Sequence, residues 1–156
     1  EDREMSYSSS LVRRLLTEGD VATAARCLGR RYTLQGMVVH GRQIGRTLGF
    51  PTANLVPCNS AQIVPQFGVY CVMVQAELWP DSALGVMNIG MRPTFDGHEP
   101  TLEVNVLDFE GDLYGQVLTV AFVARLRPEQ SFDTPQQLAA QMQRDADEAR
   151  KILKNL

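Results

Sequence analysis

The fold is decided by the stretch from Gly68 to Ile89, which reads GVYCVMVQAELWPDSALGVMNI. Its first part, residues 68–76, is rich in valine and aromatic side chains, which favour strands. The next segment, residues 79–82, is Trp-Pro-Asp-Ser, and three of these residue types are common in turns. Apolar residues return over 83–89. The stretch therefore predicts two antiparallel strands joined as a β-hairpin.

Further strands are predicted on both sides of this hairpin, over residues 32–40, 101–108 and 116–126. Glycine and proline in 90–97 predict a turn there, and two prolines in 55–65 predict an irregular connection. Several strands at short spacing with no helices between them indicate an antiparallel barrel rather than a parallel α/β sheet.

Helices are predicted at the two ends of the chain. Ser8 to Ser10 offer N-caps to a helix that ends near Gly19, and Asp20 caps a second short helix over 21–28. Thr134 and the proline after it open a C-terminal helix. Its apolar residues recur at helical spacing and are predicted to pack on the barrel, while its charged residues, Asp145 among them, are predicted to face solvent.

The composition narrows the function classes. At 156 residues the chain is large enough for one domain with a short appended piece, and a net charge of −3 offers no basic field for nucleic acid. No apolar run is long enough to span a bilayer, and the polar start does not resemble a signal peptide. The three cysteines form no Cys-x-x-Cys pair, so a cytoplasmic location with reduced thiols is expected.

A glycine-rich segment from Gly41 to Asn54 is the first candidate for a binding loop. It reads GRQIGRTLGFPTAN, and its glycines and arginines suit a loop that folds around an anionic group. Thr52 and Asn54 are two residues apart, so in an extended chain their oxygens share a face and suit a phosphate or a hard metal ion. A loop that binds nothing is the alternative, because the spacing matches neither the P-loop nor the dinucleotide motif.

Glu103 is the carboxylate in the least expected place, in the middle of a predicted strand. Strict alternation puts Leu102, Val104 and Val106 on one face of this strand and Glu103 with Asn105 on the other. Glu103 either lies on the wet side of a half-exposed sheet or faces a ligand. In the second case it can act as a general base in phosphoryl transfer.

Five motifs together resemble the riboflavin kinase family. They are Gly45 to Asn54, Gly68-Val-Tyr70, Met87 to Gly90, Glu103 to Phe109 and Leu126 to Asp133. The resemblance spans Tyr32 to the C-terminus, and the motifs keep the family's order. It implies a six-stranded antiparallel Greek-key β-barrel with a C-terminal helix, here preceded by a helical hairpin. The implied reaction transfers the γ-phosphate of ATP to the ribityl 5′-hydroxyl of riboflavin and gives FMN and ADP.

The resemblance also implies roles for individual residues. Glu103 is the implied catalytic base, and Mg²⁺ is the implied cofactor, held with the ATP phosphates near Thr52 and Asn54. The other implied ATP contacts are Gly45, Arg46, Val106, Asp108 and Tyr114, and the implied flavin contacts are Arg127, Gln130 and Phe132. Relatives often carry histidine where Asn105 stands and lysine where Gln130 stands.

The N-terminal segment carries a second resemblance. Ser8 to Arg13 is similar to the motif that closes the adenylyltransferase module of bacterial bifunctional riboflavin kinase/FAD synthetases. Residues 1–31 are therefore interpreted as a remnant of that module with its linker, and residues 32–156 as the kinase domain. A chain without the rest of the module is expected to make FMN but not FAD. The rival reading is a non-catalytic flavin- or nucleotide-binding barrel, because a fold alone does not define an activity.

Overall fold

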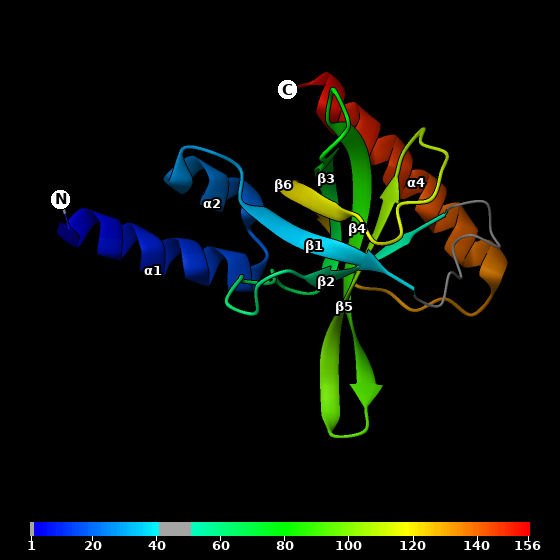
Figure 1. The fold of residues 1–156 in the computed structure, drawn as a ribbon, viewed down its shortest axis with the longest axis horizontal. Helices are drawn as coiled ribbons and strands as arrows, with labels where there is room; N and C mark the ends of the chain where they lie inside the picture. The colour runs from blue at the N-terminus through cyan, green and yellow to red at the C-terminus, as the bar shows by residue number, and fades with distance from the viewer. Residues whose placement is uncertain (1, 41–50) are drawn as a thin grey trace.

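A computed structural model describes residues 2–40 and 51–156, with side chains described throughout these ranges except at 2–8, 92 and 93. Figure 1 shows a barrel with helices at both ends of the chain. The helices are α1 (Asp2–Glu18), α2 (Val21–Leu28) and α4 (Pro135–Lys154). The strands are β1 (Thr33–Val39), β2 (Ala53–Pro57), β3 (Gly68–Ala76), β4 (Ala83–Thr94), β5 (Gly97–Val106) and β6 (Val117–Arg127).

The strands close into one barrel in the order β1-β2-β5-β4-β3-β6, and every neighbouring pair is antiparallel. The strands β3, β4 and β5 follow one another in the chain and are neighbours in the barrel. Strand β2, which precedes them in the chain, lies beside β5, which is a Greek-key arrangement. This confirms the predicted six-stranded antiparallel barrel. Closure also removes the unpaired strand edges that an open sheet would expose.

The barrel interior is an apolar core made by alternate residues of each strand. Tyr70, Leu102, Val104 and Phe122 all belong to it, and the rings of Tyr70 and Phe122 meet edge to face with centroids 5.4 Å apart. Burial of such side chains is the main stabilising contribution to a domain of this size. Because the interior is filled by packed side chains, the functional site has to lie elsewhere on the barrel.

The N-terminal hairpin packs on the barrel. Leu16 is buried in the barrel core cluster, and its carbonyl oxygen accepts a hydrogen bond of 3.1 Å from the backbone N–H of Gln66. The predicted caps of α2 are confirmed, since Asp20 accepts a bond from Thr23 and Gly29 is left-handed. The prediction that Ser8 to Ser10 cap the first helix is wrong, because α1 already begins at Asp2 in a run of acidic and other helix-compatible residues.

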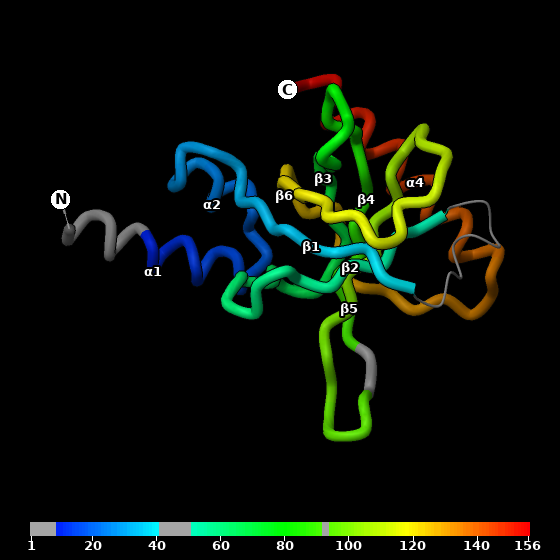
Figure 2. Tube along the Cα trace, in the orientation of Figure 1, coloured from blue at the N-terminus to red at the C-terminus, as the bar shows by residue number. Residues whose placement is uncertain are grey.

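Two predicted connections are shorter in the structure than the sequence indicates, because strands extend into them. Part of the segment 55–65 belongs to β2, whose last residue is Pro57, where the chain no longer needs a donor to the ladder. The predicted turn at 90–97 is present but shorter, since only Phe95 and Asp96 form it. Strands β4 and β5 stay paired out to Thr94 and Gly97, so they form a long hairpin that projects from the barrel (Figure 2).

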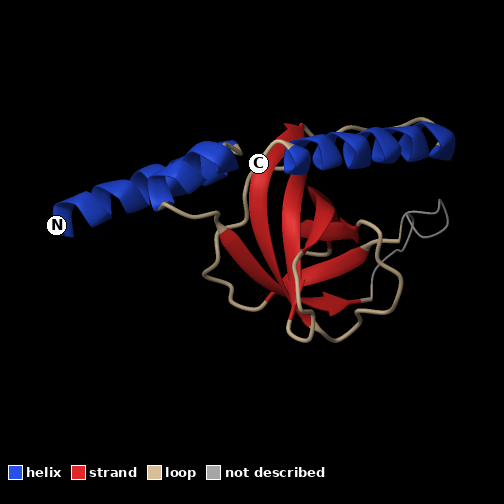
Figure 3. Cartoon of the chain, turned by 90° about the horizontal axis from the view of Figure 1, so that it is seen from above, coloured by secondary structure: helices blue, strands red, loops and turns tan. Residues whose placement is uncertain are grey.

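Helix α4 lies along the outside of the barrel against β3, β4 and β6 (Figure 3). Its predicted start is confirmed, because the Thr134 hydroxyl accepts a 3.1 Å bond from the N–H of Gln137. Its buried alanines, Ala146 and Ala149, pack against Cys71 on the outer face of β3. Burial raises the pKa of the Cys71 thiol to about 11. This cysteine therefore stays protonated near neutral pH and acts as a small apolar side chain.

None of the helices in the described part of the chain combines the length and the apolar character that crossing a bilayer requires.

Candidate active site

The candidate site is built on the outer face of β5. Leu102 and Val104 are buried inside the barrel, while Glu103 between them points to the other side and is half-buried. Glu103 is the direct cross-strand partner of Asn54 on β2 and of Asn88 on β4. Side chains at such positions share one face of the sheet. The predicted alternation is therefore confirmed, and polar groups from three strands converge on Glu103.

A cavity of about 280 Å³, called here the small cavity, lies between this outer face and α4. Its polar lining includes Glu103, and its apolar lining comes from Val86, Phe132 and Met142 among others. All three predicted flavin contacts line it. The full lining is Thr52, Val69, Val86, Asn88, Glu103, Asn105, Arg127, Glu129, Gln130, Phe132, Leu138, Met142 and Asp145. A cavity with apolar walls and a few convergent polar groups is the usual form of a small-molecule site.

Arg127, the last residue of β6, is held in the wall of the small cavity by Asp145 of α4. Its Nε lies 3.0 Å from Asp145 Oδ1, and its Nη2 lies 2.9 Å from Asp145 Oδ2. The prediction that Asp145 faces solvent is wrong, because its side chain is only 6% exposed. Met142, predicted to pack in the core, also lines the cavity. Helical periodicity predicts which face of α4 meets the barrel from its apolar residues. It does not show that Arg127 of β6 lies beside Asp145 and allows this carboxylate to be buried.

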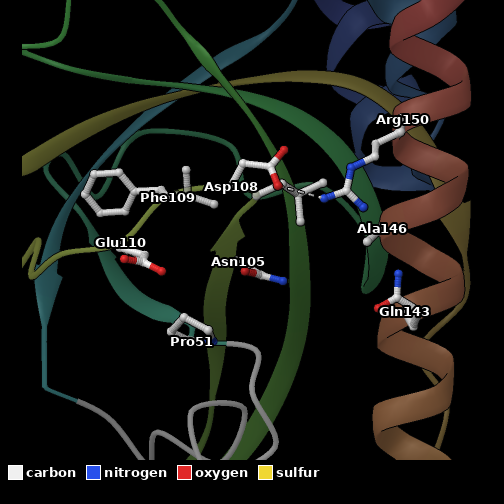
Figure 4. Close-up of a pocket in the computed structure, with 10 residues that line it drawn as sticks. Pro51, Asn105, Asp108, Phe109, Glu110, Gln143, Ala146 and Arg150 are labelled. Atoms are coloured by element: carbon white, nitrogen blue, oxygen red, sulfur yellow. Dashed lines mark hydrogen bonds and ion pairs between the residues drawn. The ribbon is translucent and has the colours of Figure 1, made fainter.

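A second hollow of about 670 Å³, called here the large cavity, lies between the segment 105–110 and α4 (Figure 4). The predicted nucleotide contacts Val106 and Asp108 line it. Asp108 has a φ of 58°, and its carboxylate meets Arg150 of α4 at 3.2 Å. The other lining residues are Pro51, Asn105, Leu107, Phe109, Glu110, Gln143 and Ala146.

Asn105 lines both cavities and is buried, which places its carboxamide at their junction. It follows Glu103 by two residues on the same strand, so both side chains lie on the outer face. Pro51 lines the large cavity and Thr52 lines the small one, so the chain also crosses between the cavities there. No role for Asn105 was predicted from the sequence. Its position two residues after the candidate base, on the same face of β5, is the sequence feature that indicates a place in the site.

The remaining predicted residues are distributed around this junction. Thr52 lines the small cavity together with Glu103, and Asn54 is the cross-strand partner of Glu103. Tyr114 lines neither of the two cavities and instead stacks on His40, with ring centroids 3.8 Å apart, beside the end of β1. Gly45 and Arg46 lie outside the described residues.

The donor set near Glu103 fits a metal that is shared with substrate phosphates. No cluster of three or more His, Cys, Asp or Glu suited to a metal occurs among the described residues. A hydroxyl and a carboxamide, those of Thr52 and Asn54, lie beside the single carboxylate of Glu103. Magnesium is commonly bound by one or two protein groups together with phosphates and water rather than by an all-protein cage. The site is therefore suited to magnesium only as part of a nucleotide complex.

Comparison with known proteins assigns the chain to a family. The family model described as Flavokinase, riboflavin kinase, matches residues 28–153. Two curated relatives are bifunctional riboflavin kinase/FMN adenylyltransferases. That of Bacillus subtilis is 40% identical over 99% of this chain and 49% of its own, and that of Escherichia coli K12 is 44% identical over 93% and 45%. The chain belongs to the riboflavin kinase family and spans about half the length of these relatives.

Solved structures agree with the observed fold. Riboflavin kinase from Trypanosoma brucei superposes with a TM-score of 0.53 at 26% identity, over 78% of this chain and 79% of that one. A protein from Streptococcus pneumoniae described as a macrolide-efflux protein superposes with a TM-score of 0.86 at 37% identity, over 91% of this chain and 46% of that one. This chain therefore matches slightly less than half of the longer protein from Streptococcus pneumoniae.

Proposed function

We propose that this chain is an ATP-dependent riboflavin kinase, which transfers the γ-phosphate of ATP to the ribityl 5′-hydroxyl of riboflavin and releases FMN and ADP. The observation that carries the proposal is the pair of adjoining cavities that meet at Asn105, two residues from Glu103. Phosphoryl transfer requires two bound substrates whose reacting atoms face each other in line. Family membership supports the same reaction.

Riboflavin is proposed to occupy the small cavity. The isoalloxazine ring is flat and largely apolar, and Val86, Phe132 and Met142 offer it an apolar wall. Arg127 and Gln130 supply polar groups for the edge of the ring system. In this pose the ribityl chain runs along the outer face of β5 toward Glu103 and the junction.

The nucleotide is proposed to occupy the large cavity, with Val106 and Asp108 among its contacts. Gly45 and Arg46 are proposed to cover its phosphates. Tyr114, which stacks on His40 and does not line the large cavity, is proposed to contact a part of the nucleotide that extends beyond that cavity. Mg²⁺ bound with ATP near Thr52 and Asn54 supplies positive charge that offsets the charge of the phosphate oxygens.

Glu103 is the proposed general base. Its carboxylate accepts the proton of the 5′-hydroxyl while that oxygen forms its bond to the γ-phosphorus. The bond from the γ-phosphorus to the β,γ-bridging oxygen breaks, and ADP leaves with that oxygen. The proton passes from Glu103 to solvent before the next turnover. Asn105, at the junction, is placed to orient the hydroxyl or a phosphate oxygen by hydrogen bonds.

The domain organisation is proposed from the relatives. Residues 32–156 form the kinase domain, and residues 1–31 correspond to the end of an adenylyltransferase module and its linker. We propose that these 156 residues by themselves make FMN and do not convert it to FAD.

The test is to incubate the protein with riboflavin, ATP and Mg²⁺ and to separate the flavins by chromatography. We expect FMN and ADP in equal amounts and no FAD. Riboflavin that stays unconverted, at the level of the enzyme-free control, would contradict the proposal. If riboflavin nevertheless bound, as measured by quenching of its fluorescence, the rival hypothesis of a non-catalytic flavin-binding barrel would be favoured.

A further inference from the structure

We infer that Asp145 is a positioning residue for riboflavin, which acts by fixing the guanidinium of Arg127 in the wall of the small cavity; the inference rests on the proposed function. Both residues line this cavity, one from the end of β6 and one from α4. Their contact is thus made between two elements that enclose the proposed flavin site.

The geometry of the pair is that of a two-pronged carboxylate–guanidinium contact. Arg127 Nε lies 3.0 Å from Asp145 Oδ1 and 3.3 Å from Oδ2, and Arg127 Nη2 lies 2.9 Å from Oδ2. The side chains are 18% and 6% exposed. Two parallel hydrogen bonds fix the plane of the guanidinium as well as its position, which a single contact does not.

Asp145 is itself held in place. Gln141, one helical turn earlier on α4, donates a 2.9 Å hydrogen bond from Nε2 to Asp145 Oδ1. Among the residues whose side chains are described, Asn105 and Asp145 are the buried polar or charged ones. A carboxylate is costly to bury, and in such a position it is expected to carry a specific partner.

Arg127, once fixed by Asp145, also contacts the segment that follows β6. Its Nη1 lies 3.2 Å from the carbonyl oxygen of Pro128, and its Cζ lies 5.8 Å from the centre of the Phe132 ring. Pro128 and Phe132 therefore both contact a guanidinium whose orientation is set from α4. Two proposed flavin contacts, Arg127 and Phe132, are preorganised in this way, which reduces the ordering cost of binding.

The experiment compares steady-state kinetics of the wild type with Asp145→Asn, Arg127→Ala and the double variant. We expect Asp145→Asn to raise the KM for riboflavin by about tenfold or more, as loss of a charge-assisted hydrogen bond predicts, and to change the KM for ATP by less than about twofold. The double variant should have the riboflavin KM of Arg127→Ala alone, because Asp145 acts through Arg127. Glu148→Gln, an exposed carboxylate on the same helix, is the matched control and should behave as the wild type.

Three results would overturn the inference: an unchanged riboflavin KM in Asp145→Asn, equal rises in both KM values, or multiplicative effects in the double variant. If Asp145→Asn does not fold, Gln141→Ala tests the same chain of contacts without leaving a buried charge unpaired. It should raise the riboflavin KM by a smaller factor, and an unchanged KM there counts against the inference. A wild type that makes no FMN contradicts the proposed function itself, whereas an active wild type with an unaffected Asp145→Asn contradicts only the positioning role.

Discussion

The two faces of β5 carry out different tasks with alternate residues of one strand. On the inner face Leu102 and Val104 are buried in the apolar core of the barrel, whereas on the outer face Glu103 and Asn105 line cavities beside α4. The inner residues are held by packing, and the outer ones are placed by the backbone that this packing fixes. The comparison teaches that stability and chemistry can be changed separately here, residue by residue along the same strand.

The largest effect is expected on the outer face. Glu103→Gln removes the proposed base while keeping the shape of the side chain, so kcat should fall by about 10²–10⁴-fold with little change in melting temperature. Glu77→Gln, an exposed carboxylate after β3, is the control and should keep full activity. The measurement is the rate of FMN formation beside a thermal unfolding curve. A near-normal rate in Glu103→Gln would assign the residue to an ordinary half-exposed sheet face.

The next effect is expected on the inner face, with the opposite pattern. Leu102→Ala leaves a cavity in the core, so the free energy of unfolding should fall by about 2–5 kcal/mol. At a temperature where the variant is still folded, its kcat should stay close to that of the wild type. Leu78→Ala, at a side chain that is 90% exposed, should change stability by less than about 0.5 kcal/mol. Denaturant unfolding followed by circular dichroism gives these values. If kcat fell as steeply in Leu102→Ala as in Glu103→Gln, the two faces would not be separable.

A smaller effect is expected from Thr52, the residue that precedes the neighbouring β2. Thr52→Val removes a hydroxyl that is proposed to hold Mg²⁺ and the ATP phosphates but keeps nearly the same volume. We expect the Mg²⁺ concentration for half-maximal rate to rise and kcat to fall by about tenfold, the value of one hydrogen bond to a charged group. Thr94→Val, near the tip of the projecting hairpin, is the control. An unchanged Mg²⁺ dependence in Thr52→Val would exclude the hydroxyl as a ligand.

The smallest effect concerns the N-terminal hairpin, which belongs to neither face of β5. The hydrogen bonds from Thr23 hold the pKa of Asp20 below its usual range, and nearby Arg26 lowers it further. A carboxyl with a lowered pKa stabilises the fold above its unfolded pKa and loses that contribution as the pH falls through its folded pKa.

Asp20→Ala should therefore lower the free energy of unfolding by about 1 kcal/mol at pH 7, as loss of a helix N-cap does, without changing kcat. The difference from the wild type should shrink as the pH falls below the ordinary aspartate pKa of 3.8. Glu148→Ala is the control at an exposed position of α4. A difference that stayed constant down to pH 2, measured by denaturant unfolding, would mean that the charge of Asp20 contributes nothing.

The sequence predicted those parts of the fold that depend on local pattern. Strand β3 was predicted with its observed bounds, because its run of β-branched and aromatic residues is strong and begins at a glycine. Strand β2 was missed because Pro57 and Pro65 indicate a break over 55–65, whereas pairing with β1 and β5 on either side stabilises a short strand that ends at Pro57. Local propensity was overridden there by tertiary pairing.

The site, like the fold, was predictable only where it depends on local sequence pattern. Period-2 alternation placed Glu103 on the outer face, as observed. The burial of Asp145 was not predictable, because helical spacing alone does not show that Arg127 of β6 contacts it in the wall of the small cavity. The junction role of Asn105 also depends on the shapes of two cavities that distant segments enclose.

The most direct test of the central claim is a crystal structure of the protein with riboflavin, ADP and Mg²⁺. The account predicts the flavin in the small cavity, the ADP phosphates on the far side of Asn105, and the riboflavin 5′-hydroxyl about 2.6–3.2 Å from a carboxylate oxygen of Glu103 or joined to it by one water. A complex in which both substrates are bound but Glu103 lies away from the 5′-hydroxyl, or in which the flavin lies outside the small cavity, would contradict it.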